Sequence, residues 1–435
     1  MTAGAREAPE LPPVVDEDSE RDPYPLYERL RREAPLHWDE PTRRWYVSRR
    51  ADVEKLLLDR RLGAHDYPEW IRDLPPDQAA AVVPVEDHLA RWPVFSDRPA
   101  QVLLRRLLQP ALSRRAAAEL ADWIGRMTRS QAEALPDAAA DLLADFARPA
   151  ALRTVCRLLG VPADDAGRRL VDWSDALIAY LGGSGIDIDR ARRARPAVEG
   201  LERFVREELL PDARTPVARL LADALRHERV ELADIAAMVA QLVTGGIEPT
   251  ATATCTMMLH AARAPDPAGT ALIVGGADGT DGTEGTALLE SEAVVEAALR
   301  ADPPFHIAPR EAKCDFDYRG QRIARGQRVA LLLASAGHDR EAAGPAACPV
   351  SAARDPGAAS HPDSHLGSNG GSHLAFGQGR HYCLGAPLAR AHLQAAWRAL
   401  SRAGVPRRID LGAVERGAEF GLTTFLRVPL RAQRP

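Results

Sequence analysis

Residues 376–385 read FGQGRHYCLG and precede a helical run from Ala386 to Leu400. Gly377 and Gly379 permit tight, non-helical backbone around Cys383, which stands just ahead of the start of that helix. The free amides and the dipole at a helix N-terminus favour an anion, so this position predicts a thiolate. A thiolate in such a sheltered turn suits a soft metal such as haem iron. The alternative is one more small buried cysteine, which is the usual fate of this residue type.

This stretch, with the LAR sequence that follows it, resembles the haem-binding loop of the cytochrome P450 family of haem-thiolate monooxygenases. The six defining positions of the pattern FGxGxHxCxG are all present: Phe376, Gly377, Gly379, His381, Cys383 and Gly385. The resemblance implies that Cys383 is the metal ligand, bound axially to the iron of haem b, and that the other five positions belong to the cofactor-binding loop. It extends over nearly the whole chain, through the segments 22–27, 35–38, 45–58, 96–106 and 303–310.

Helical periodicity dominates the rest of the sequence. The predicted helices cover residues 116–135, 138–160, 165–181, 189–209, 216–227, 231–262, 289–300 and 385–403. Strand signals are short and fall at residues 44–47, 316–318, 321–323 and 328–333. This pattern predicts a mainly α protein with small β-sheets. The resemblance implies one cytochrome P450 domain over residues 1–435, a triangular helical prism around haem.

Two Gly-rich polar stretches, residues 263–288 and 355–373, predict flexible surface insertions. The spacing of His361, His365 and His373 in the second stretch leaves metal binding as a weaker alternative to a solvated loop.

Composition narrows the function further. The chain has 435 residues, of which 27% are charged, with a net charge of -5 and a pI near 6.2. This balance argues against nucleic-acid binding, because such proteins usually carry a basic excess. No apolar run approaches the length of a membrane span and the start is acidic and Pro-rich, so we expect no membrane anchor and a cytoplasmic protein. Five scattered cysteines without a CxxC pair disfavour a disulfide framework or a structural zinc site.

The resemblance also implies partners for the two haem propionates, namely Arg105, Arg310 and His381. Two carboxylates buried with a porphyrin need charge-assisted donors, whereas each arginine taken alone would more often lie at the surface. The family usually has a histidine four residues before the first of these arginines. Here that position is Gln101, which can donate a hydrogen bond but carries no charge.

Residues 244–250, TGGIEPT, lie within the long predicted helix 231–262 and resemble the central I helix of the family. The usual pattern there is (A/G)-G-x-(D/E)-T, whose acid and threonine relay protons to dioxygen. Glu248 matches the acid, but Pro249 stands at the threonine position. Thr250 follows one residue later, about 100° further round the helix, so it cannot simply substitute.

Proline lacks an amide hydrogen and collides with the carbonyl group four residues back, here that of Gly245, so we predict that the helix opens locally at Pro249. Our hypothesis is that Gly245, Gly246 and Pro249 form the dioxygen groove without the hydroxyl group. Protons would then come through water, Glu248, Thr250 or the substrate. The alternative is a kink without catalytic meaning.

A second departure lies in the segment that resembles the K helix, whose family pattern is E-x-x-R. Aligned on Arg300, the glutamate position is Ala297, whereas Glu296 lies four residues before the arginine. That spacing still allows an ion pair on a helix. Arg354 resembles the arginine that completes this network in the family. We therefore predict a rearranged structural cluster of Glu296, Arg300 and Arg354.

The resemblance implies a cytochrome P450 monooxygenase-type oxidoreductase that uses electrons from a separate ferredoxin and its reductase. We predict oxygen-dependent hydroxylation, or oxidative coupling or cyclisation, of a natural-product (secondary metabolite) intermediate, as a hydrophobic small molecule or bound to a carrier or peptide. We expect a monomer. An acidic redox partner would meet basic residues near the proximal face, for which a solvated surface is the alternative: Arg106, Arg114, Arg380 and Arg390.

The competing hypothesis is a catalytically degenerate P450-like scaffold or partner protein in a biosynthetic pathway. Pro249 and Ala297 favour it, and the complete thiolate loop around Cys383 opposes it. We expect the substrate pocket to be lined by residues 66–97, 165–209, 241–248, 305–307 and 420–424.

Overall fold

The computed structural model describes residues 13–432 except 65–70, 72–73, 98, 139, 182–186, 228, 264–283 and 340–372, and the side chains of 284–290 are not described. The predicted insertions at 263–288 and 355–373 therefore lie almost wholly outside the described residues. The described residues of the first segment, 263 and 284–288, are helical rather than loop: Arg263 ends one helix and residues 284–288 begin the next.

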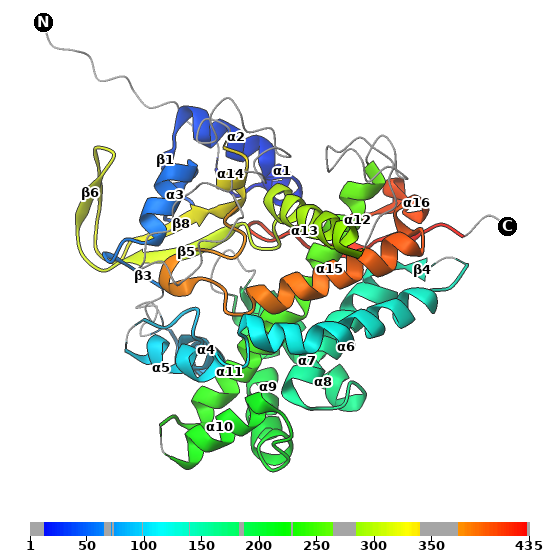
Figure 1. Ribbon diagram of the computed structural model, residues 1–435. Helices are drawn as coiled ribbons and strands as arrows, with labels where there is room; N and C mark the ends of the chain where they lie inside the picture. Colours follow the sequence, from blue (N-terminus) through cyan, green and yellow to red (C-terminus); the bar gives the residue numbers. More distant parts are fainter. Residues whose placement is uncertain are drawn as a thin grey trace, which may run out of the picture.

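The helices form most of the structure (Figure 1). The α-helices are α1 (Glu17–Arg21), α2 (Tyr24–Glu33), α3 (Arg50–Leu57), α4 (Pro76–Ala90), α5 (Ala100–Leu108), α6 (Arg114–Glu133), α7 (Arg148–Leu159), α8 (Asp165–Leu181), α9 (Ile188–Phe204), α10 (Pro216–Arg226), α11 (Leu232–Gly246), α12 (Glu248–Arg263), α13 (Glu284–Ala301), α14 (Leu333–Gly337), α15 (Ala386–Arg402) and α16 (Val405–Arg408). The described residues also include two π-helical turns, η2 (Leu142–Ala147) and η3 (Val205–Leu209), and two 3-10 turns, η7 (Gly379–His381) and η8 (Leu411–Ala413).

The largest sheet has the strand order β1-β2-β8-β5-β3 and joins distant parts of the chain. Its strands are β1 (Leu36–Asp39), β2 (Arg44–Val47), β3 (Leu62–Gly63), β5 (Ile307–Ala312) and β8 (Arg328–Leu332). β2 runs parallel to β8, with Arg44 opposite Arg328, and β5 runs antiparallel to β8, with Arg310 opposite Val329. Three two-stranded sheets pair β4 (Ala140–Asp141) with β11 (Pro429–Leu430), β6 (Phe316–Tyr318) with β7 (Gln321–Ile323), and β9 (Glu415–Arg416) with β10 (Phe425–Arg427).

Figure 1 shows the large sheet with α2, α3 and α14 on one side of the molecule and α6 to α10 on the other. α15 packs along α6, and α12 and α13 also pack against α15. α11 contacts α7, α8 and α9, so it runs through the helical layer. Every residue of α12 from Thr250 to Leu259 is buried, as expected of a helix surrounded by others. Within the described residues, no helix combines the length and apolar character needed to cross a bilayer.

The mainly helical fold class is confirmed, and most predicted helices appear within a few residues of their expected ends. The predicted helix 231–262 is divided, because α11 ends at Gly246, Ile247 bends away, and α12 begins at Glu248. Pro249 has no amide hydrogen for the Gly245 carbonyl, which accounts for an interruption directly before it. Helix α4 is absent from the predicted set, since its two internal or leading prolines, Pro76 and Pro84, obscure the helical pattern.

Candidate active site

The Cys383 loop, residues 376–385, folds back on itself directly before α15. Gly377 and Gly379 have φ angles of 69° and 68°, in the left-handed region that favours glycine. The Cys383 amide donates to the Phe376 carbonyl at 2.9 Å, which closes the loop. Gly385 is the N-cap of α15, so the cysteine directly precedes the helix N-terminus, as the sequence predicts.

The Cys383 side chain combines exposed surface with close surroundings of protein. Its side chain has exposed surface, although burial by the surrounding protein raises the pKa of the thiol. Both observations hold for a thiol that faces an internal space. The amides of Gly385 and Ala386 and the Arg105 guanidinium oppose the effect of burial and favour the thiolate. A cation bound at the sulfur would shift this balance towards the anion.

Three guanidinium groups and an imidazole gather beside this loop from three parts of the chain: Arg105 on α5, Arg310 on β5, and Arg380 and His381 on η7. Arg310 is 6% exposed, and burial with the nearby Arg380 lowers its pKa to about 10. Burial and the three arginines lower the pKa of His381 to about 3. The cluster therefore repels further positive charge and attracts an anion.

Several donors of this cluster are unused within the described chain. Both ring nitrogens of His381 and Nε of Arg380 are buried and have no hydrogen-bond partner there. The Pro93 carbonyl is close enough to favour a protonated His381 ring but makes no hydrogen bond of ordinary geometry with it. Asp97 lies 3.9 Å from Arg380 and 4.0 Å from His381, too far for strong pairing. A buried ligand with two carboxylates, such as haem, fits this excess of charge and free donors.

Two predicted cofactor residues on α5 hold the backbone of the loop. Gln101 is buried and donates from its amide nitrogen to the Arg380 carbonyl at 2.6 Å. Arg105 donates to the Tyr382 carbonyl at 2.7 Å. Gln101 therefore orients the cationic cluster through the backbone, a contact that the sequence does not indicate.

The two glycines of the central helix have different surroundings. A Cβ added to Gly245 would meet no atom of the described chain within 4 Å, so this residue borders open space. A Cβ at Gly246 would lie 2.7 Å from a methyl group of Val155, so this residue permits close packing of α11 on α7. Pro249 follows Gly245 by one helical turn. The open space therefore adjoins Gly245, whereas Gly246 is packed against α7.

Glu248 is buried and accepts a hydrogen bond at 3.0 Å from Nε of Arg148 on α7. The other end of that guanidinium lies 3.8 Å from Asp175 on α8. The exposed fractions of the three side chains are 10% for Glu248, 35% for Arg148 and 45% for Asp175, so the chain of charges leads outwards. Thr250 is also buried, and its carbonyl accepts from Thr254. Arg148 was missed in the sequence, where nothing links it to a glutamate in another helix.

Glu296 pairs with residues other than those predicted. Its carboxylate accepts from Nε and Nη2 of Arg390 on α15, at 2.5 and 3.1 Å, and lies 3.0 Å from Nε2 of His373. Despite burial, these hydrogen bonds lower the pKa of Glu296 to about 2. The Glu296 carboxylate opposes the lowering of the Arg300 pKa by burial. Arg354 lies outside the described residues. The cluster around Glu296 therefore faces the Cys383 loop.

A family model described as cytochrome P450 matches residues 204–400. The chain is 28% identical to the vitamin D(3) 25-hydroxylase of Pseudonocardia autotrophica over 382 residues, which are 85% of this chain and 83% of that protein. It aligns with the crystal structure of CalO2 at a TM-score of 0.74 and 27% identity, covering 97% of this chain and 98% of the other.

The chain belongs to the cytochrome P450 family. It is an oxidoreductase of the P450 monooxygenase type, whose members carry haem on a cysteine thiolate. A further relative, the polyketide biosynthesis cytochrome P450 PksS of Bacillus subtilis, is 23% identical over 391 residues, 87% of each chain.

Two of the segments expected to line the P450 substrate pocket are joined in the structure. Phe305 and Leu422 form an isolated antiparallel bridge, and the His306 amide donates to the Gly421 carbonyl at 2.9 Å. Phe305 is 40% exposed despite this pairing, so its ring is available for an apolar ligand. Gln241 on α11 accepts from the Val94 amide, which ties a third segment to the central helix. Trp70, in the first expected segment, lies outside the described residues.

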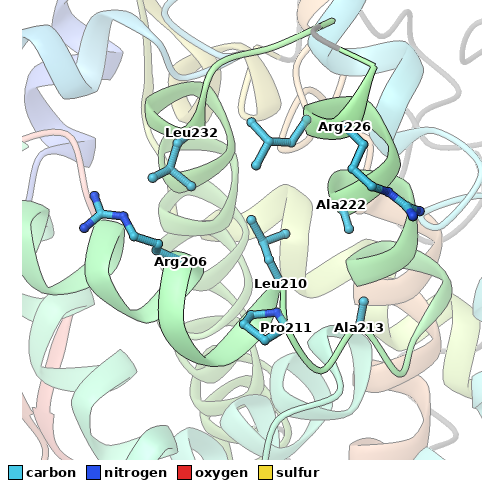
Figure 2. A pocket seen from close by; sticks show the side chains of 8 residues that line it. Arg206, Leu210, Pro211, Ala213, Ala222, Arg226 and Leu232 are labelled. Atoms are coloured by element: carbon cyan, nitrogen blue, oxygen red, sulfur yellow. The ribbon is translucent and has the colours of Figure 1, made fainter.

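A separate cavity of about 550 Å³ lies between η3, α10 and the start of α11. Figure 2 shows Arg206 and Arg226 on opposite sides of it, with Leu210 between them. Of its lining residues, only Arg206 falls in a segment expected to line the substrate pocket, residues 165–209, and α10 lies at the end of the molecule away from the large sheet (Figure 1). This cavity is distinct from the P450 site around Cys383.

Proposed function

We propose that this P450 binds haem b through the Cys383 thiolate and catalyses oxygen-dependent oxidation of a natural-product intermediate. The observation that supports it best is the buried cationic cluster with unused donors directly beside the cysteine loop. A scaffold without cofactor would bury this charge at a cost and gain nothing from it. When bound, haem supplies the oxidising chemistry, and the protein supplies binding, orientation and proton delivery.

Arg105, Arg310 and His381 would hold the two propionates. His381 is neutral when no anion is present, since its pKa is about 3. A bound carboxylate would favour the protonated ring, so its two free nitrogens would become charged donors. Phe376, Gly377, Gly379 and Gly385 shape the loop, and the amides after Cys383 stabilise the thiolate.

We further propose that Gly245 and Pro249 border the place where dioxygen is lodged and that Glu248 delivers protons. Arg148 stays protonated and cannot pass a proton itself. It holds the Glu248 and Asp175 carboxylates at either end of its guanidinium. Water must therefore bridge the two acids, or Glu248 must turn from Arg148 towards the open space. Thr250 and the substrate are the other proton donors that this proposal allows.

The substrate would be hydrophobic, either free or bound to a carrier or peptide, and the reaction would be hydroxylation, coupling or cyclisation. The exposed ring of Phe305 and the polyketide-pathway relative support this choice. A ferredoxin-type partner would supply electrons. Of the basic residues expected to meet it, Arg106 and Arg114 are exposed, whereas Arg380 and Arg390 are engaged within the site.

An absorption spectrum of the reduced, carbon monoxide-treated protein tests the proposal. We expect the long-wavelength Soret band of thiolate-ligated haem, lost in Cys383→Ser and kept in Cys314→Ser, because Cys314 is an exposed cysteine outside the site. A band unchanged in Cys383→Ser would contradict the assignment. A folded wild-type protein that binds no haem would instead favour the scaffold hypothesis, to which Pro249 and Ala297 point.

A further inference from the structure

The Glu296 carboxylate joins three parts of the chain that surround the thiolate loop. Arg390 on α15 binds both carboxylate oxygens, and His373, at the start of the loop, binds one of them. All three side chains are largely buried, with exposed fractions of 14% for Glu296, 2% for His373 and 23% for Arg390. A bidentate arginine and an imidazole on one carboxylate give a directional contact that depends on all three residues.

His373 has its tautomer fixed by this arrangement. Nδ1 accepts a hydrogen bond from the Ala375 amide at 3.1 Å, so it carries no proton. The proton is therefore on Nε2, which donates to Glu296 at 3.0 Å. The imidazole thus fixes the backbone at Ala375, directly before Phe376. The Phe376 carbonyl in turn accepts a hydrogen bond from the Cys383 amide.

Arg390 reaches the loop from its other end. Its guanidinium carbon lies 4.4 Å from the centre of the Phe376 ring, and Nη1 lies 3.3 Å from the Tyr382 hydroxyl. The arginine therefore touches residues on both sides of the closing hydrogen bond of the loop. Glu296 neutralises the charge of Arg390 at this place, so the carboxylate influences both the shape of the loop and the field at the thiolate.

We propose that Glu296, His373 and Arg390, here called the Glu296 clasp, are positioning residues that hold the Cys383 thiolate against haem iron. This proposal rests on the proposed haem binding. The clasp acts through the loop and does not touch the reacting atoms. Loss of its carboxylate removes a negative charge near the sulfur, which favours the reduced iron and shifts the reduction potential to more positive values.

The test compares Glu296→Gln with Arg398→Ala in the haem-loaded protein. Arg398 on α15 donates to Ser291 on α13 at 3.2 Å, so it joins the same two helices without contacting the loop. We expect the carbon monoxide complex of Glu296→Gln to convert from the thiolate band to the imidazole-like band roughly tenfold faster than wild type, because one partner of a buried pair is left uncompensated. Its reduction potential should rise, whereas Arg398→Ala should match wild type in both measurements.

His373→Gln provides a second variant that keeps the Glu296–Arg390 pair. We expect faster conversion of the thiolate band with little change in potential, because the charges remain while the loop is loosened. Glu296→Gln and His373→Gln that both behave like Arg398→Ala would overturn the clasp while the proposed function stands. A wild-type protein without the thiolate band would overturn the proposed function itself.

Discussion

Three glycines with nearly the same φ angle allow the thiolate loop to be tested apart from general stability. Gly377, Gly379 and Gly404 have φ angles of 69°, 68° and 68°. The first two lie in the Cys383 loop, and Gly404 lies between α15 and α16. We consider each of them replaced by alanine, which adds a single methyl group.

The stability cost should be similar at all three positions. An L-residue in the left-handed region costs roughly 1–2 kcal/mol, and the stiffer unfolded chain returns about 0.4–1 kcal/mol, so about 1 kcal/mol remains. The new Cβ would meet no described atom within 4 Å at Gly404 and only the His381 carbonyl, at 3.7 Å, at Gly377. At Gly379 it would lie 2.6 Å from a methyl group of Leu58, but that side chain is 55% exposed and can rotate away.

Denaturant unfolding and the spectrum of the carbon monoxide complex together separate the two effects. We expect all three alanine variants to lose about 1 kcal/mol of unfolding free energy. We expect Gly377→Ala and Gly379→Ala also to lose the thiolate band, whereas Gly404→Ala keeps it. An unchanged unfolding midpoint in Gly404→Ala would refute the backbone argument. Thiolate bands as stable in the loop variants as in Gly404→Ala would refute the role of the loop geometry.

Pro249→Thr should restore an amide hydrogen and change the ratio of product formed to reductant consumed, with little change in unfolding free energy, because Pro249 lies in the first turn of α12, where proline is tolerated; an unchanged ratio would contradict a special role for the proline. Arg148→Gln removes the cation that holds Glu248 and should slow oxidation roughly tenfold or more, measured as product formation against Arg153→Gln, an exposed change on the same helix. For Glu296, a pKa lowered from 4.5 to about 2 means that the unfolded state binds the proton more tightly. Its stabilising effect is complete above pH 4.5 and fades as the pH falls towards 2, so Glu296→Gln should flatten this part of the acid-unfolding curve, and an equally steep curve would contradict the assignment.

Local sequence patterns were sufficient for the parts of the structure that depend on local physics. The spacing of glycines around Cys383 predicts the folded-back loop, and the helix after it begins where the pattern requires. Pro249 predicts an interruption of the central helix because the loss of an amide donor is a property of one residue. Helix α4 was missed because Pro76 and Pro84 weaken a pattern that packing against α9 nevertheless stabilises.

Contacts between distant residues could not be predicted in the same way. Glu296 has Arg300 one helical turn away, but Arg390 of another helix offers two parallel hydrogen bonds and takes the carboxylate. Arg148 reaches Glu248 across a separation of one hundred residues, for which no spacing rule exists. Such pairs depend on how the helices pack, and the sequence pattern describes only the face that each helix buries.

The parallel pairing of β2 with β8 has a consequence for the order of folding. Arg44 cannot meet Arg328 until most of the chain has been synthesised, and β5, which bears Arg310, is placed in the sheet through its pairing with β8. This step should be slow, because the chain loses the entropy of closing a long loop before the strand contacts can stabilise it. The helical layer can assemble earlier from local contacts. Cofactor capture should therefore be among the last events of maturation, after β2 has paired with β8.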